Sequence, residues 1–173
     1  GICRNQLGEL QEIYPELTQL GGEVVALSVD NAENAAEMKD AYGLEFPVLY
    51  DTDTAVATAY GVYDLLGDGV SAPATFIIRT DGTIESALIG TSISERPTPD
   101  SILEVLASLA EMDRKVMTDS ADGAGVVLPM AEAPEIGQLV PDFDLPTASG
   151  ETVSLSENLG ERNVVLVFFR SWW

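Results

Sequence analysis

Residues 163–170 (NVVLVFFR) form an almost unbroken apolar run at the end of the chain. A strand that is covered on both faces has this composition, whereas a strand with one solvent face alternates apolar and polar residues. The run therefore predicts a strand in the interior of a sheet. A native chain seldom stops straight after such a strand, and Gly1 is not an initiating methionine. We therefore expect residues 1 and 173 to differ from the ancestral ends.

The rest of the chain alternates helical and extended patterns, which indicates an α/β layered fold. Leucines at three- and four-residue steps predict a helix over 7–20, kinked at Pro15 and ended by Gly21-Gly22. Further helices are predicted over 31–42, 54–60 and 98–114. Strands are predicted over 23–30, 46–50, 75–80, 83–89, 143–145 and 152–155, with turns at Asp81-Gly82 and Ser149-Gly150.

A composition change separates the last predicted helix from the hairpin near residue 150. Residues 117–134 are rich in Ala, Gly, Asp and Pro and show no hydrophobic period. They are therefore predicted to form a linker without a core strand or a long helix. With 173 residues, the whole chain, 1–173, is expected to form a single domain.

The charge balance excludes several classes of partner. The chain has 29 acidic and 8 basic residues, with a formal net charge of −21. Strong binding to nucleic acid or to anionic lipid needs basic patches, so neither is expected. The acid residues form either a solvated surface or a face for a basic partner. No segment is apolar enough to span a membrane and no signal peptide begins the chain, so a cytoplasmic location is expected.

Cysteine and histidine counts limit the chemistry further. The chain has one cysteine and no histidine, which excludes an intrachain disulfide framework and zinc sites of the Cys/His type. Gly67 and Gly69 do not form a phosphate-binding pattern, so no nucleotide is implied. We expect no cofactor and no metal.

Five segments together resemble one protein family. They are 136–145 (IGQLVPDFDL), 149–155 (SGETVSL), 168–173 followed by 1–4 (FFRSWW, GICR), 23–28 (EVVALS) and 72–82 (APATFIIRTDG). Together they resemble the alkyl hydroperoxide reductase and thiol-specific antioxidant type of peroxiredoxins and redoxins. The resemblance implies a thioredoxin-like fold: a central mixed sheet flanked by helices, with a small β-hairpin extension.

The order of these segments resembles the family order only after circular permutation. That order begins at Met117 or later, runs to Trp173 and continues from Gly1 to about Val116. One position is missing between Trp173 and Gly1. The missing residue could be Cys, Thr, selenocysteine or none. The order could reflect a natural permutation, an engineered one or a fragment of a tandem gene.

The resemblance implies that Cys3 is a nucleophile that reacts with peroxide. The first turn of a helix can lower a cysteine pKa to about 3.5–7.5, because free N–H groups and a partial positive charge stabilise the thiolate. Arg4 and Arg170 are candidate electrostatic helpers. The alternative reading of Cys3 is a buried, inert cysteine at a helix start.

Substrate contacts and partners also follow from the resemblance. Pro73 matches the cis-proline that faces the thiol in thioredoxins, although an ordinary trans proline opening a strand is the alternative. Thr75, Trp172 and Trp173 are further candidate substrate contacts. The substrate would be a peroxide or a disulfide, and the reductant an external thiol, either a thioredoxin or a small thiol, because a second cysteine is absent. A homodimer is left open. A redoxin-fold module without turnover is the competing functional class.

Overall fold

The computed structural model describes residues 2–116 and 133–170, with side chains from 4 to 113 and from 133 to 170. Its strands are β1 (Gly22–Ser28), β2 (Val48–Tyr50), β3 (Ala74–Ile78), β4 (Ile84–Ile89), β5 (Asp144–Pro146), β6 (Thr152–Ser154) and β7 (Asn163–Phe168). Its helices are α1 (Ile2–Gln19), α2 (Ala32–Tyr42), α3 (Ala55–Ala59), α4 (Pro99–Val116) and α5 (Leu155–Asn158).

The predicted interior strand lies at the centre of a mixed five-stranded sheet with the order β2-β1-β7-β3-β4. β7 pairs in parallel with β1 along its whole length, with Ala26 opposite Val167, and antiparallel with β3, with Thr75 opposite Val167. Every residue of β7 is buried. The prediction of an interior strand over this apolar run is therefore confirmed, since neighbouring strands cover both edges of β7 and other elements cover both of its faces.

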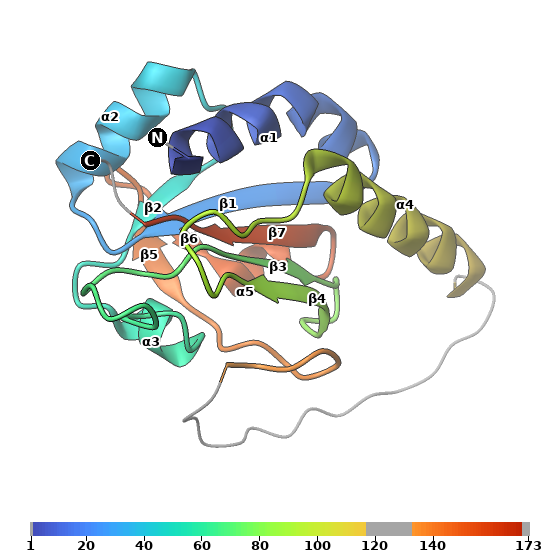
Figure 1. Ribbon diagram of the computed structural model, residues 1–173. Helices are drawn as coiled ribbons and strands as arrows, with labels where there is room; N and C mark the ends of the chain where they lie inside the picture. The colour runs from blue at the N-terminus through green and yellow to red at the C-terminus, as the bar shows by residue number, and fades with distance from the viewer. Residues whose placement is uncertain (1, 117–132, 171–173) are drawn as a thin grey trace.

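Two cores fill the two faces of the sheet, and β7 contributes alternate side chains to each. On one face, α1, α2 and α4 cover Val165 and Val167. On the other face, α3, α5 and the β5–β6 hairpin cover Val164, Leu166 and Phe168. Figure 1 shows the three longer helices on one side of the sheet and the short elements on the opposite side. This arrangement confirms the predicted thioredoxin-like fold with a small hairpin extension.

Local signals set both ends of α2 and the start of α4. The Asn31 side chain accepts a hydrogen bond from the Asn34 N–H at the start of α2, and Gly43 ends that helix with a φ of 58°. Pro99 is the first residue of α4, where its missing N–H costs nothing. The predicted linker, 117–134, lies almost entirely outside the described residues and stays a prediction. Sequence reasoning did not predict α5, which is a single turn.

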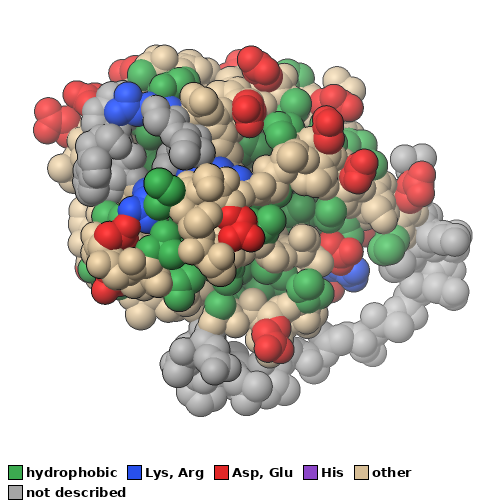
Figure 2. Space-filling model, viewed as in Figure 1, with side chains coloured by type: hydrophobic (Ala, Val, Ile, Leu, Met, Phe, Trp, Pro, Cys, Tyr) green, Lys and Arg blue, Asp and Glu red, His purple; other side chains and the backbone are tan. Residues whose placement is uncertain are grey.

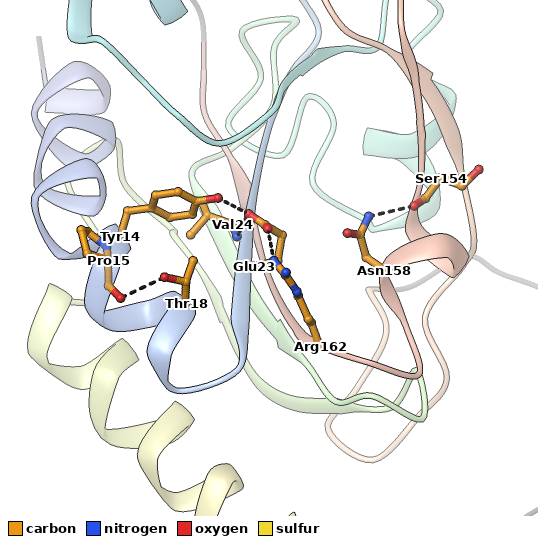
Figure 3. Close-up of polar contacts among 8 residues, drawn as sticks. All are labelled: Tyr14, Pro15, Thr18, Glu23, Val24, Ser154, Asn158 and Arg162. Carbon is orange, nitrogen blue, oxygen red and sulfur yellow. Dashed lines mark hydrogen bonds and ion pairs between the residues drawn. The ribbon is translucent and has the colours of Figure 1, made fainter.

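A polar network ties the carboxyl-terminal half of α1 to the sheet (Figure 3). The Tyr14 hydroxyl donates to Glu23 Oε1 at 2.8 Å, and the Val24 N–H donates to the same oxygen at 3.0 Å. Arg162 pairs with Glu23 Oε2 at 2.9 Å from the segment that leads into β7. Burial, followed by the hydrogen bond to Glu23, raises the pKa of Tyr14 above its ordinary value. The phenol therefore keeps its proton in the folded protein.

We predict an alkaline loss of stability that depends on Tyr14. An unfolded tyrosine ionises near pH 10. Because the folded pKa is raised, the stabilising contribution is fully present below about pH 10 and falls as the pH rises further. Urea unfolding of the parent and of Tyr14→Phe at about pH 8 and about pH 11 measures this. The variant should be less stable at pH 8 by about 0.5–1.5 kcal/mol, the usual value of a hydrogen bond. It should also lose less stability on going to pH 11, and an equal loss in both proteins would contradict the prediction.

Candidate functional site

Among the sequence-predicted site residues, the described positions lie at one edge of the sheet. The carboxyl ends of β1 and β7 lie together there, and the Phe169 N–H extends the pairing by donating to the Leu27 carbonyl at 3.0 Å. α1 precedes β1 and runs back over it, so its first turn lies above this same edge (Figure 1). Cys3 is the second residue of α1. Its backbone therefore lies in the helical turn that offers free N–H groups.

A buried contact places the next turn of α1 over β3. Gln6 is only 7% exposed, and its Nε2 lies 3.5 Å from Oγ1 of Thr75, which is 3% exposed. Gln6 follows Cys3 by three residues, so the two positions are neighbours on the helix surface. The predicted substrate contact Thr75 thus lies beneath the start of α1, where it is held by Gln6. Trp172, Trp173 and the junction with Gly1 lie outside the described residues, so the permuted order stays a prediction.

The two predicted arginines have different surroundings. Arg170 follows β7 and forms an ion pair with Asp68, with the two side chains 20% and 35% exposed. Asp68 belongs to a loop that is closed by Asp64, whose Oδ1 accepts the Gly69 N–H at 2.7 Å. Arg4 lies in the first turn of α1 and is partly buried. Through its ion pair, Asp68 therefore offsets part of the charge of Arg170.

The expected cis bond before Pro73 is not found. Every peptide bond in the described ranges is trans, including the bond between Ala72 and Pro73. The trans form is the lower-energy state of an X–Pro bond by about 0.5–1 kcal/mol, and it is compatible with the pairing of β3 with β4 at this position. The Pro73 carbonyl accepts the Gly90 N–H at 2.8 Å, which extends this antiparallel ladder by one step beyond β3. Pro73 is therefore a buried trans proline just before a strand, as in the alternative considered from the sequence.

Gly90 also fixes the segment between β4 and α4. A Cβ on Gly90 would come within 2.9 Å of both the Glu95 carbonyl and Pro73 Cγ, so the segment folds back where only glycine fits. Thr91 donates from its N–H and its hydroxyl to Glu95, both at 2.9 Å, and these bonds lower the pKa of that carboxyl. This returning segment, residues 90–98, then passes beside α1.

Two adjoining cavities border this returning segment, and Pro97 lines both. The first, of about 520 Å³, lies between α1 and the returning segment. The second, of about 240 Å³, lies between α4 and the β3–β4 face and is mainly apolar. The first is lined by Asn5, Gln6, Glu9, Ser94, Arg96, Pro97, Thr98 and Pro99. The second is lined by Thr75, Ile77, Ser86, Leu88, Pro97, Ser101, Ile102 and Val105.

Sequence reasoning missed Gln6, Asp68 and Arg96. The only signal for Gln6 was its helical spacing from Cys3, and neither Asp68 nor Arg96 lies in a recognisable motif. It also missed Asp51, which is fully buried at the carboxyl end of β2 and accepts the Ala57 N–H at 2.8 Å. Burial raises the pKa of the Asp51 carboxyl.

The described ranges contain neither a helix suited to crossing a membrane nor a cluster of side chains suited to a metal ion. None of the helices within 2–116 and 133–170 combines the length and apolarity that crossing a membrane requires. In the same ranges, no group of three or more His, Cys, Asp or Glu side chains could hold a metal ion.

Comparison with known sequences matches the AhpC/TSA family over residues 1–87, which include Cys3, Pro73 and Thr75. The chain belongs to the AhpC/TSA family. The thiol-disulfide oxidoreductase ResA of Bacillus anthracis is 30% identical over 95 residues, covering 54% of this chain and 51% of that protein. A Mycobacterium tuberculosis protein of strain H37Rv that is named as a peroxiredoxin, Rv2521, is 36% identical over 87 residues, covering 47% of this chain and 55% of that protein.

A solved structure extends the similarity to most of the fold. The crystal structure of Enterococcus faecalis AhpC matches with a TM-score of 0.57 and 26% identity, covering 72% of this chain and 73% of that one. The AhpC/TSA resemblance that the sequence indicated is thereby confirmed. The chain spans about half the length of the curated relatives it matches.

We predict that Gly90→Ala destabilises the protein. The added methyl group must displace either backbone or the Pro73 ring, and overpacking of this kind costs about 1–3 kcal/mol. Gly8→Ala is the matched control. Gly8 lies inside α1, and a Cβ added there would be 3.6 Å from Tyr42, which is an ordinary contact distance. The control should gain about 0.5–1 kcal/mol from helix propensity. Urea unfolding followed by circular dichroism measures both, and an unchanged stability of Gly90→Ala would refute the proposed close approach.

Proposed function

We propose that this chain is a thiol-dependent peroxidase or a closely related thiol oxidoreductase, with Cys3 as its nucleophile. The observation that carries the proposal is the position of Cys3. The sole cysteine lies in the first turn of α1, at the sheet edge formed by the carboxyl ends of β1 and β7, in a chain of the AhpC/TSA family. Relatives named as peroxiredoxin and as thiol-disulfide oxidoreductase support a thiol-based reaction.

The proposed reaction has two stages. The Cys3 thiolate attacks one oxygen of a peroxide ROOH, the O–O bond breaks, and the products are a cysteine sulfenic acid and, after protonation, the alcohol ROH. An external thiol then attacks the sulfenic acid sulfur, releasing water and leaving a mixed disulfide. A second thiol cleaves this disulfide and restores the Cys3 thiol. With one cysteine in this sequence, both reducing thiols would come from outside it.

The chain's own residues would support the first stage by electrostatics. Free N–H groups in the first turn of α1 would stabilise the thiolate, and Arg4 adds a positive charge in the same turn. Arg170, at the end of β7, would contribute less because of Asp68. Gln6 and Thr75 would fix the position of the helix start over β3. Pro73, Trp172 and Trp173 stay candidate substrate contacts.

We predict that Cys3→Ser abolishes peroxide turnover. A serine hydroxyl is a far weaker nucleophile than a thiolate, so the rate should fall about a hundredfold or more, roughly 2.7 kcal/mol of barrier. Hydrogen peroxide and an organic hydroperoxide are supplied in turn with dithiothreitol, and peroxide consumption is followed. Mass spectrometry of the parent after peroxide treatment should show one added oxygen on the peptide that contains Cys3.

A disulfide substrate separates the two activities within the proposal. The parent and Cys3→Ser are compared in the reduction of a small model disulfide. Faster reduction by the parent, without peroxide turnover, would select the oxidoreductase. If the parent and the variant react equally slowly with both substrates, the proposal fails and a redoxin-fold module without turnover is left.

A further inference from the structure

The cavity beside α1 has the size of a small-molecule site, and several of its lining residues carry polar groups. Its volume of about 520 Å³ lies within the range of typical ligand pockets. Asn5 and Gln6 bring amides to it, and Ser94 and Thr98 bring hydroxyls. These groups can donate and accept hydrogen bonds to a peptide-like molecule. A peroxide as small as hydrogen peroxide needs none of this space, so the cavity points to a larger molecule.

Two opposite charges in this cavity select the kind of molecule. Glu9 lines it from α1 and Arg96 lines it from the returning segment. An Arg96 guanidinium N–H also donates to the Ile93 carbonyl at 3.1 Å, which orients the guanidinium group. Guanidinium groups bind carboxylates in two-pronged geometry, and carboxylates bind ammonium groups. A ligand that carries both a carboxylate and an ammonium group, as amino acids do, complements the pair.

The charge distribution of the visible surface agrees with this assignment. The chain has a net charge of −21, so it repels anions over most of its surface. On the face shown in Figure 2, most of the visible Lys and Arg side chains gather around the start of α1. A local cationic region of this kind can admit a carboxylate where the rest of the surface would reject it.

We propose that this cavity binds an amino-acid-derived thiol, which reduces oxidised Cys3. Its α-carboxylate pairs with Arg96 and its α-ammonium group with Glu9. Gln6, which lines the cavity, lies one turn from Cys3 on α1. The ligand's thiol attacks the sulfenic acid of Cys3, forms a mixed disulfide and releases water, and a second thiol molecule restores Cys3 and leaves as the symmetric disulfide. The reductive step rests on the proposed function of Cys3.

Binding is tested without any redox chemistry. S-Methylcysteine carries both charges and cannot react, so its affinity for the Cys3→Ser protein is measured by NMR titration. Adding Arg96→Gln or Glu9→Gln should weaken binding about tenfold. Glu12→Gln is the matched control, because Glu12 is exposed on the same helix but does not line the cavity, and it should bind as before. Absence of binding, or equal weakening in all three variants, would overturn the proposal.

Reduction is tested with four thiols that differ only in charge pattern. Cysteine carries both groups, cysteamine the ammonium group, 3-mercaptopropionate the carboxylate, and 2-mercaptoethanol neither. After correction for thiolate fraction, cysteine should reduce peroxide-oxidised Cys3 at least about tenfold faster than 2-mercaptoethanol. Arg96→Gln should remove the advantage of the carboxylate, and Glu9→Gln that of the ammonium group.

The two arms separate the two hypotheses. Binding of S-methylcysteine without peroxide oxidation of Cys3 would reject the proposed function and leave the site. Oxidation of Cys3 with equal reduction by all four thiols would leave the proposed function and reject the site. Reduction of oxidised Cys3 by a protein dithiol, but by none of the four small thiols, would also reject the site.

Discussion

The burial of β7 on both faces and both edges is the constraint on which the rest of the structure depends. Six consecutive buried residues can be accommodated only if β1 and β3 flank the strand and separate helical layers cover its two faces. This requirement places α1 over the same edge at which β7 ends. The candidate site is therefore a consequence of how the core is assembled. Any change that shifts β7 along β1 would also move Arg170 and Thr75 relative to the start of α1, because both positions are fixed by the register with Val167 and Phe168.

Local signals in the sequence predicted most of this fold. Hydrophobic period, the cap residues Asn31 and Gly43, and the proline at the start of α4 are short-range effects that act within a few residues. The apolar run over 163–170 predicted the central strand, because a strand with one solvent face would alternate apolar and polar residues. The Asp81-Gly82 turn likewise predicted the antiparallel pair β3 and β4, which the structure contains.

Long-range contacts at the site could not be predicted in the same way. Gln6 and Thr75 are 69 residues apart in sequence, and Arg170 and Asp68 are 102 apart. Neither pair has a local pattern that distinguishes it from other polar residues on a helix or a loop. Similarity to thioredoxins suggested a cis bond at Pro73, whereas the bond is trans in the structure. The resemblance therefore indicated the position of the candidate site, whereas the partner of Arg170 could be found only in the structure.

Those noncovalent partners have a further consequence for the proposed chemistry. The end of β7 and the start of α1 are far apart in this sequence, yet the candidate site needs both. Three contacts hold the two sides in place: Phe169 with Leu27, Arg170 with Asp68, and Gln6 with Thr75. A thiolate at Cys3 gains most from N–H groups that are already oriented. By keeping the start of α1 in place over β3, the contact between Gln6 and Thr75 would serve the proposed reaction as well as the fold, so its removal should lower both stability and reactivity.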